Sequence, residues 1–285
     1  MTKKYSELEL EQIANSIRKD IITMLEHAGS GHSAGPLGLA DIFTALYFDV
    51  LRHDPKKPNW NERDILLLSN GHCAPVQYAT MAEAGYFNKK ELLTLRQFGS
   101  RLQGHPERKK LPGLENTSGP LGCGLSQAIG MGLAMRLNKQ HHRWIYVVLG
   151  DGELDEGNVW EAAMLAPKHG LHNIIAIVDR NNIQIDGPTE NVVPLEDLRA
   201  KWEAFGWHVI EIDGNSIEAV IDACAMARAV VEKPVVIIAH TIPGKGVDFM
   251  EYDFHWHGMP PNHEQAVEAL HELRTLGGKI RSEHE

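Results

Sequence analysis

The sequence has no long apolar run and no excess of positive charge. No segment approaches the roughly 20 consecutive apolar residues that a membrane-spanning helix needs. The N-terminus turns acidic at Glu7 and lacks the apolar centre of a signal peptide. The formal net charge is −10, from 28 Lys and Arg against 38 Asp and Glu, which disfavours a general nucleic-acid binder. We therefore expect neither a membrane nor a nucleic acid among the partners.

Cysteines and linkers are also scarce. Cys73, Cys123 and Cys224 are odd in number and far apart, which excludes a disulfide framework and favours packing roles. A reducing, cytoplasmic compartment is the expectation. The apolar fraction of 43% and the charged fraction of 23% are ordinary for a globular chain. Because no repeat and no low-complexity linker interrupts the pattern, we expect a single domain over residues 1–285, with a polar C-terminal tail from about residue 275.

The N-terminal part predicts two helices around a glycine-rich loop. Ser6 and Glu9 form a capping box, apolar residues follow at helical spacing, and Gly29 supplies a stop, which predicts a helix over residues 6–28. The loop 29–36 comes next, and a second helix is expected from Pro36.

The rest of the chain alternates apolar runs with helical patterns. Runs without polar alternation indicate strands that are covered on both faces, as in a parallel sheet. Strands are expected at 65–68, 145–149, 174–178, 207–212 and 235–238. Helices are expected at 123–139, 158–169, 196–205 and 216–232 and again after residue 264. This alternation predicts an α/β fold, a doubly wound and mostly parallel sheet with helices on both faces.

Two polar turns follow neighbouring strands of this sheet. Gly150-Asp151-Gly152 comes directly after the run 145–149, and Asn181-Asn182 stands after the run 174–178. Ligands of open α/β sheets bind beyond the carboxyl ends of the strands. A carboxylate, an amide oxygen and a nearby carbonyl are the hard ligands that suit Mg²⁺ or Ca²⁺. The alternative is that Asp151 only caps the next helix and the asparagines only form a turn.

These segments resemble the thiamine-diphosphate enzymes and, among them, transketolase. The resemblance spans about residues 10–265, and its segments occur in the family's order. They are Ser30-Gly31-His32, 69–72, 104–107, 119–124, 150–157 with 160–163, 179–187 and His257-Gly258. The resemblance implies the thiamine-diphosphate-binding fold, with thiamine diphosphate and Mg²⁺ as cofactors and Ca²⁺ or Mn²⁺ as substitutes for Mg²⁺.

The resemblance also implies which residues hold the cofactor. Asp151, Asn181 and the main-chain carbonyl of Ile183 would bind the metal, and Gly152 would donate its N–H to the diphosphate. The remaining implied cofactor contacts are Gly119 and Leu121 at the rings, His72 and His257 beside the cofactor, and Glu156 in an acidic network at a dimer interface.

Four histidines form the implied catalytic set. His72 and His257 would face the catalytic centre, and His32 and His105 would reach sugar hydroxyls. His32 and His257 are the candidates for moving the hydroxyl proton, because imidazole titrates near neutral pH. A zinc pair at His255 and His257 is a weaker interpretation, since no further ligands follow at finger-like spacing.

The chain ends where the family's first domain ends. The resemblance therefore implies one subunit of a split transketolase, an α2β2 heterotetramer whose partner supplies the pyrimidine-binding domain. The expected reaction moves a two-carbon ketol unit from a ketose phosphate to an aldose, as in pentose phosphate metabolism. Deoxyxylulose-phosphate synthase and keto-acid dehydrogenase components share the two turns, but the segments 104–107 and 119–122 with His257 favour transketolase.

Some alternatives stay open at this point. One is a specialised enzyme for an unusual sugar phosphate or a sulfonated sugar, and another is a non-catalytic module that binds the cofactor. The chain departs from the family pattern at Ser33-Ala34, at Cys73-Ala74-Pro75 and at Cys123, where glutamine is common. These departures bear on the acceptor sugar rather than on cofactor binding.

Overall fold

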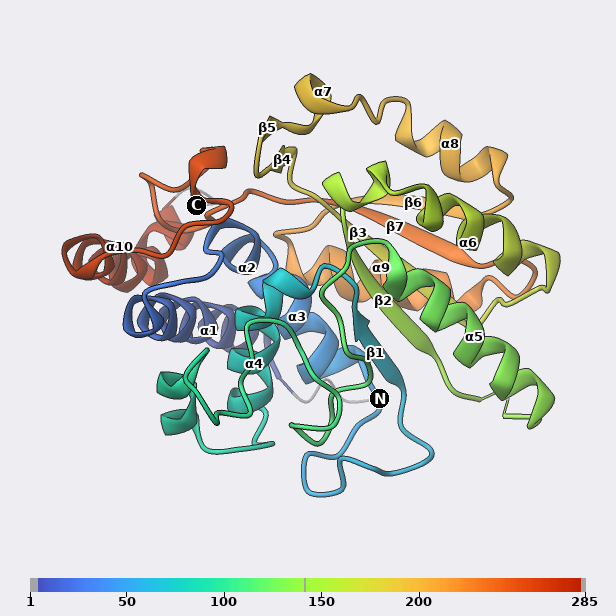
Figure 1. The fold of residues 1–285 in the computed structure, drawn as a ribbon, viewed down its shortest axis with the longest axis horizontal. Coiled ribbons are helices and arrows are strands. Elements are labelled where there is room, and N and C mark those ends of the chain that lie inside the picture. The colour runs from blue at the N-terminus through green and yellow to red at the C-terminus, as the bar shows by residue number, and fades with distance from the viewer. Residues whose placement is uncertain (1–4, 141, 283–285) are drawn as a thin grey trace.

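A five-stranded parallel sheet, with the strand order β1-β2-β3-β7-β6, forms the centre of the molecule (Figure 1). The computed structural model describes residues 5–140 and 142–282, and residues 275–282 by their backbone only. The strands are β1 (Ile65–Leu68), β2 (Ile145–Gly150), β3 (Ile174–Arg180), β6 (His208–Asp213) and β7 (Val235–His240). A small antiparallel hairpin of β4 (Ile183–Gln184) and β5 (Gly187–Pro188) follows β3. The expected parallel α/β sheet is confirmed.

Helices cover both faces of this sheet (Figure 1). One face carries α1 (Glu7–Ala28), α2 (Ala34–Gly38), α3 (Ala40–Ala45), α4 (Ala74–Glu83), α9 (Ile217–Ala229) and α10 (His263–Ser282). The other carries α5 (Cys123–Leu137), α6 (Gly157–Lys168) and α8 (Leu198–Ala204), and α7 (Thr189–Val192) lies in the loop before α8. Short turns are 3₁₀-helical at Gly71–Cys73, Lys89–Thr94, Gly152–Asp155 and Phe254–Trp256, and π-helical at Leu46–Val50.

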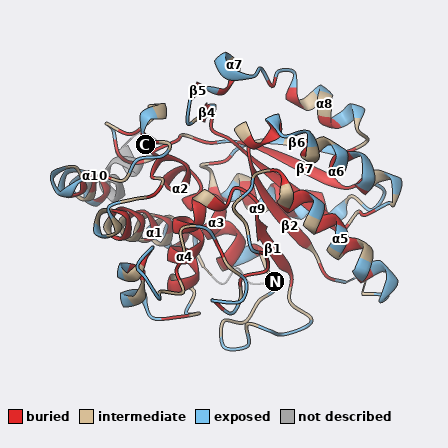
Figure 2. Cartoon of the chain, in the orientation of Figure 1, coloured by how far each residue is buried: buried red, intermediate tan, exposed pale blue. Residues whose placement is uncertain are grey.

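Strands β1, β2, β3 and β7 are mainly apolar because each contributes to two cores, whereas β6 includes exposed polar residues. In β1, Leu66 and Leu68 pack with α1, α4 and α9, whereas Ile65 and Leu67 pack with α5 and α6. The same alternation continues in β2, β3 and β7, and Figure 2 shows the sheet buried between the two helical layers. Side chains of neighbouring strand residues point to opposite faces, so a strand that is covered on both sides needs apolar residues at every position.

The N-terminal helix begins and ends as expected. Ser6 Oγ accepts the Glu9 N–H at 3.3 Å, and Glu9 Oε2 accepts the Ser6 N–H at 2.8 Å, which completes the capping box. The helix ends at Gly29, whose φ is 61°, a left-handed conformation that glycine adopts without strain.

Other helix limits differ from the expectation. The second helix starts at Ala34 rather than Pro36 and is interrupted at Leu39. α5 ends at Leu137, because Lys139 has a left-handed φ of 56°. α8 begins at Leu198 rather than Glu196, since Asp197 is its N-cap and accepts the Ala200 N–H.

Several elements were not predicted, among them α4, the β4–β5 hairpin and the short helix α7. α4 is buried on every side from Ala74 to Ala82, so it has no polar face that would reveal a helical period. The β4–β5 hairpin has strands of only two residues, too short for a period to be recognised.

The remaining expectations concern the ends and the compartment. The backbone of the expected polar tail is helical up to Ser282, and residues 283–285 lie outside the described residues. All three cysteines are free. None of the helices in the described part of the chain combines the length and the apolar character that crossing a bilayer requires.

Candidate functional site

The two polar turns meet at the carboxyl ends of β2 and β3. Gly150 pairs with Asp179 in the sheet register, so the next residues of the two strands leave the sheet side by side. Asp151 Oδ2 accepts the Asn182 N–H at 2.6 Å, and Oδ1 accepts the Gly152 N–H at 2.8 Å. The structure therefore brings Asp151 to the Asn181-Asn182 turn, as parallel neighbouring strands require.

The local roles that we considered as alternatives are also present. Asp151 is the N-cap of the 3₁₀ turn that follows it, and Asn181 Oδ1 accepts the Ile183 N–H at 3.0 Å. An ionised carboxylate offers about four acceptor positions, and three donors reach Asp151. The Asn181 oxygen keeps a second lone pair. Capping and turn formation therefore leave oxygen positions for a hard divalent cation.

Arg180 ties the Asp151 turn to the segment that follows the hairpin. Its side chain is 3% exposed, and Nη1 donates to Asp151 Oδ2 at 3.2 Å and to Thr189 Oγ1 at 2.8 Å. Nη2 donates to Glu190 Oε1 at 2.7 Å and to Glu196 Oε1 at 2.8 Å. The guanidinium thus neutralises part of the buried charge of Asp151 and fixes the start and end of the α7 segment.

Three buried carboxyl groups surround this turn: Asp151, Asp179 and Glu153. Burial raises the pKa of Asp151 to about 6, although Arg180 and the donated N–H groups act in the opposite direction. Burial raises the pKa of Asp179 to about 7, against the hydrogen bond from Thr241, and the neighbouring charge of Asp151 adds to the rise. Burial likewise raises the pKa of Glu153 to about 7. Such a concentration of carboxyl groups favours a bound cation.

The donor set is of a particular kind. Within residues 5–140 and 142–282, no group of three or more His, Cys, Asp or Glu side chains is arranged to hold a metal ion. The expected set needs only one of these residue types, Asp151, together with an amide oxygen and a main-chain carbonyl. It matches the oxygen ligands of Mg²⁺ rather than the nitrogen and sulfur ligands of zinc.

Three of the four predicted histidines come together. His32 follows α1, His72 follows β1, and His257 follows the 3₁₀ turn Phe254–Trp256. The ring centroids are 4.9 Å apart for His32 and His72, 5.1 Å for His72 and His257, and 5.9 Å for His32 and His257. We call these three residues the histidine cluster. Segments that are far apart in the sequence therefore build one group of imidazoles.

Burial keeps the histidine cluster uncharged. It lowers the pKa of His32 to about 4, with the nearby charges of His257, Arg96 and His105 adding to the effect. It lowers the pKa of His72 well below its ordinary value and also lowers that of His257. Within residues 5–140 and 142–282, the buried Nδ1 atoms of His32 and His257 find no hydrogen-bond partner. Neutral imidazoles with a free ring nitrogen are suited to accept or donate a proton.

His105 is placed differently. It is exposed and makes no ring contact with the histidine cluster, but its charge acts on His32 and His72. Burial and the Arg96 guanidinium lower the pKa of His105. Arg96 has a left-handed φ of 60° and lies against Gly31 and Gly104, where any side chain would meet its guanidinium. His105 and Arg96 thus stand at the rim of the histidine cluster.

The loops around these groups contact one another. A Cβ on Gly258 would lie 3.3 Å from Ile185 and 4.0 Å from His32, and a Cβ on Gly152 would lie 3.1 Å from Gln184. The hairpin that follows β3 therefore bridges the Asp151 turn and the histidine cluster. On the other side, a Cβ on Gly71 would collide with Ser118, so the His72 turn packs against the loop that carries Gly119.

The remaining predicted residues are Gly119, Leu121 and Glu156. Gly119 and Leu121 are half-buried, and a Cβ on Gly119 would meet no atom within 4 Å. Open space beside a glycine backbone fits the close approach of a flat ring. Glu156 is exposed in the single chain, and its Cβ would lie 2.9 Å from a Cβ on Gly122.

His255 and His257, which were considered as a zinc pair, contact different neighbours. His255 Nδ1 lies 2.6 Å from Asp253 Oδ1, and the ring stacks on Phe254 with 4.1 Å between centroids. His257 instead contacts His32 and His72.

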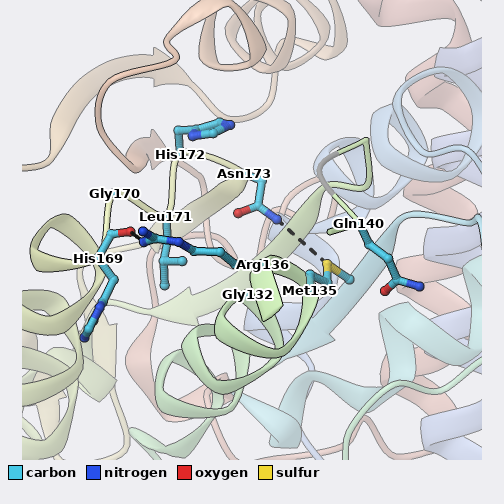
Figure 3. A pocket seen from close by; sticks show the side chains of 9 residues that line it. All are labelled: Gly132, Met135, Arg136, Gln140, His169, Gly170, Leu171, His172 and Asn173. Atoms are coloured by element: carbon cyan, nitrogen blue, oxygen red, sulfur yellow. Dashed lines mark hydrogen bonds between the residues drawn. The ribbon is translucent and has the colours of Figure 1, made fainter. Parts of the chain in front are cut away.

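Cavities elsewhere do not contain the predicted residues. One of about 260 Å³ is lined by Arg136, His169, His172 and Asn173 (Figure 3). It lies where β3 begins, the edge of the sheet opposite to Asp151. A second, of about 500 Å³, includes Arg63, Glu115 and Arg143. Neither contains a residue of the site.

Sequence reasoning missed several residues of the site. Arg180 and Asp179 were seen only as parts of a motif, and Glu153 and Arg96 were not singled out. Glu153 stands next to the Gly150-Asp151-Gly152 turn, and a buried position for an acid so close to a glycine turn was the available signal. No local pattern marks Arg96.

Comparisons with known proteins agree with this arrangement. The chain matches the family model "Transketolase, thiamine diphosphate binding domain" over residues 10–277. It is 40% identical to one of the subunits of apulose-4-phosphate transketolase from Phocaeicola vulgatus, with 97% of both chains covered. It is 41% identical to 6-deoxy-6-sulfo-D-fructose transketolase subunit SqwG of a Clostridium species, covering 95% of this chain and 98% of the relative.

Solved transketolases share the fold. The structure from Campylobacter jejuni superposes with a TM-score of 0.88 at 34% identity and covers 95% of this chain but 43% of the other. A transketolase mutant from Pichia stipitis gives the same TM-score, 96% of this chain and 41% of the other. The chain thus spans about two fifths of the solved enzymes, whereas it matches the two relatives that are named as subunits over nearly their whole length. It belongs to the transketolase family, as its thiamine-diphosphate-binding domain.

Proposed function

We propose that this chain is the cofactor-binding subunit of a two-chain transketolase that uses thiamine diphosphate and a divalent cation, normally Mg²⁺. The enzyme transfers a two-carbon ketol unit from a ketose phosphate to an aldose. The observation that carries the proposal is the shared edge of the sheet. There the Asp151 turn and the histidine cluster are joined by the β4–β5 hairpin.

Each group has a role in this proposal. Asp151, the Asn181 amide oxygen and the Ile183 carbonyl hold the metal, and the Gly152 N–H binds the diphosphate. Gly119 and Leu121 contact the rings. When bound, thiamine diphosphate supplies the electron sink for breaking and making the carbon–carbon bond.

The histidines act on the sugar. His32 and His257 accept the proton of a hydroxyl and return it, because burial lowers the pKa of both and an uncharged imidazole can take up a proton near neutral pH. His72 completes the wall beside the cofactor, and His105, at the rim with Arg96, binds a sugar hydroxyl. The four histidines are therefore assigned to the substrate and the cofactor rather than to the metal.

The partner and the substrate class come from the relatives. Two relatives of nearly equal identity are named as subunits for different sugars, one a sugar phosphate and one a sulfonated sugar. We propose a partner chain with the pyrimidine-binding domain and an α2β2 assembly in which Glu156 lies at the interface. An anionic ketose or aldose is the substrate, in pentose phosphate metabolism or in the breakdown of a specialised sugar.

Reconstitution tests the proposal. The chain is mixed with its partner chain, thiamine diphosphate and Mg²⁺, and ketol transfer is assayed with ketose phosphates and a 6-sulfonated ketose as donors. We expect transfer only in the complete mixture. Asp151→Asn should weaken cofactor binding by about a hundredfold or more, because outer contacts of a metal site alone are worth about 10–100-fold.

Asp222→Asn is the matched control, since Asp222 is exposed on α9. It should bind the cofactor as the parent chain does. A complete mixture that binds thiamine diphosphate tightly but transfers no ketol unit would instead indicate a non-catalytic binding module.

A further inference from the structure

Glu153 is a buried acid to which none of these roles has been given. It is 2% exposed and lies in the 3₁₀ turn directly after Asp151 and Gly152. Oε1 accepts the Ser69 hydroxyl and the Gly122 N–H, the latter at 2.7 Å, and Oε2 accepts the Gly150 N–H at 3.0 Å. Every partner is a donor, so both carboxylate oxygens act as acceptors.

The three donors come from three separate segments. Ser69 follows β1, Gly122 closes the loop 119–122 in front of α5, and Gly150 ends β2. Ser69 Oγ in turn accepts the Gly124 N–H at 3.0 Å. Glu153 and Ser69 together therefore hold two consecutive turns of the segment 119–124 against the end of the sheet.

Close packing allows the segment 119–124 only one position against the sheet. A Cβ on Gly124 would lie 2.4 Å from Ser69 Cβ, and Gly122 has a left-handed φ of 78°. A side chain at either position is excluded by collision or by strain. The backbone of the loop is thus in direct contact with the groups that bind it.

We propose that Glu153 is a positioning residue that fixes the ring-lining loop 119–122 at a set distance from the diphosphate-binding turn 150–152. The inference rests on the proposed function, in which one cofactor molecule is held by both segments. A ligand that two loops must grip at once binds more tightly when their spacing is set beforehand, because less order is then lost on binding.

Two variants test whether Glu153 positions the loop 119–122. In Glu153→Gln the amide must present its NH₂ to a backbone N–H, either that of Gly122 or that of Gly150, whichever way it turns. We expect the Kd for thiamine diphosphate, measured with Mg²⁺ in the reconstituted enzyme, to rise about tenfold, the effect of one lost charge-assisted hydrogen bond. Ser69→Ala removes the hydroxyl that donates to Glu153 and accepts the Gly124 N–H, but leaves the carboxylate with its two backbone donors, so a smaller rise of about threefold is expected. Glu232→Gln, an exposed glutamate before β7, is the matched control and should leave the Kd unchanged.

Hydrogen exchange provides a readout that needs no cofactor. In the chain alone, the amides of residues 119–125 should exchange faster in Glu153→Gln and in Ser69→Ala, while distant helices exchange as in the parent chain. Unchanged exchange in this segment, or a uniform increase throughout the protein, would overturn the positioning role. If Glu153→Gln does not fold, Ser69→Ala decides the question by the same two measurements. If the variants exchange faster than the parent chain, but the reconstituted parent enzyme binds no thiamine diphosphate, the proposed function is wrong. The positioning of the loop 119–122 by Glu153 would still hold.

Discussion

The Asp151 turn and the histidine cluster lie at one edge of the sheet, yet their polar atoms are satisfied in different ways. Asp151 receives three donors, and Asp179 receives the Thr241 hydroxyl and the Asn181 amide. In the histidine cluster, the buried Nδ1 atoms of His32 and His257 have no hydrogen-bond partner among the residues that the structure describes.

The two regions thus differ in how far folding alone satisfies the hydrogen bonds of their buried polar groups. Buried polar groups are nearly always hydrogen-bonded, and those that are not call for an explanation. The Asp151 turn is organised by Arg180 and by backbone amides, so its geometry is set before any ligand arrives. In the histidine cluster, by contrast, no donor or acceptor among the described residues fixes the Nδ1 atoms of His32 and His257, so contacts between the three rings do more to set their positions.

The largest effect expected from this comparison is a loss of catalytic rate that leaves the affinity for thiamine diphosphate unchanged. His32→Ala in the reconstituted enzyme should lower kcat by about 10²–10⁴-fold, the usual contribution of a positioned acid or base. The Kd for thiamine diphosphate should stay within about twofold, because the turn that holds the diphosphate is complete without His32. Steady-state kinetics and calorimetric titration measure the two quantities.

His172→Ala provides the control for this variant. His172 lines the cavity at the opposite edge of the sheet (Figure 3), so its loss should change neither quantity. If His32→Ala lost cofactor affinity as severely as rate, the division between the two regions would be wrong.

The next effect concerns the stability of the Asp151 turn. Arg180→Met should lower the free energy of unfolding by about 3 kcal/mol, because it leaves the buried Asp151 carboxylate without its charge partner. Arg180 also holds Thr189, Glu190 and Glu196, so proteolysis should then become faster within the α7 segment. Urea unfolding of the chain without metal measures the free energy.

Arg199→Met is the matched comparison. Arg199 pairs with Glu203 and Glu211 on the surface, and its side chain is 42% exposed, so the cost should stay below about 1 kcal/mol. If both variants lowered the free energy of unfolding equally, the buried pair of Arg180 with Asp151 would stabilise the chain no more than a surface pair does.

The contrast also explains how much of the molecule could be predicted from its sequence. Strands that are apolar at every position, the capping box of α1 and the glycine-rich loops are local patterns, and each predicted its element. The histidines were recognised because the segments that carry them resemble those of the transketolase family and occur in the family's order. The partners of Glu153 and Arg180 were not predictable in this way. Ser69 and Gly122 meet Glu153 only after β1, α5 and β2 have packed, and α4 has no polar face that would show its period.

The smallest effect tests the protonation of the two regions. The folded pKa of Asp151, about 6, lies above its ordinary value of 3.8, so between these values the folded chain binds more protons than the unfolded one and stability falls as pH rises. For His32, folded near 4 against an ordinary 6.5, the unfolded chain binds more protons and stability falls as pH drops. The two contributions therefore oppose each other between about pH 4 and about pH 6.

Magnesium distinguishes the contribution of Asp151 to the pH dependence of stability from that of His32. A divalent cation favours the ionised form of Asp151 and competes with its proton, whereas the neutral histidines are not its ligands. The difference in melting temperature with and without Mg²⁺ should therefore grow from about pH 5 to about pH 7 and then level off, equivalent to about 1 kcal/mol. The histidine contribution cancels in this difference, because it is present in both samples. Thermal unfolding in the presence of Mg²⁺ or of a chelator measures it. A difference that stays constant over this range would show that Asp151 is already ionised at pH 5, and the charge of Arg180 would then outweigh the cost of burial.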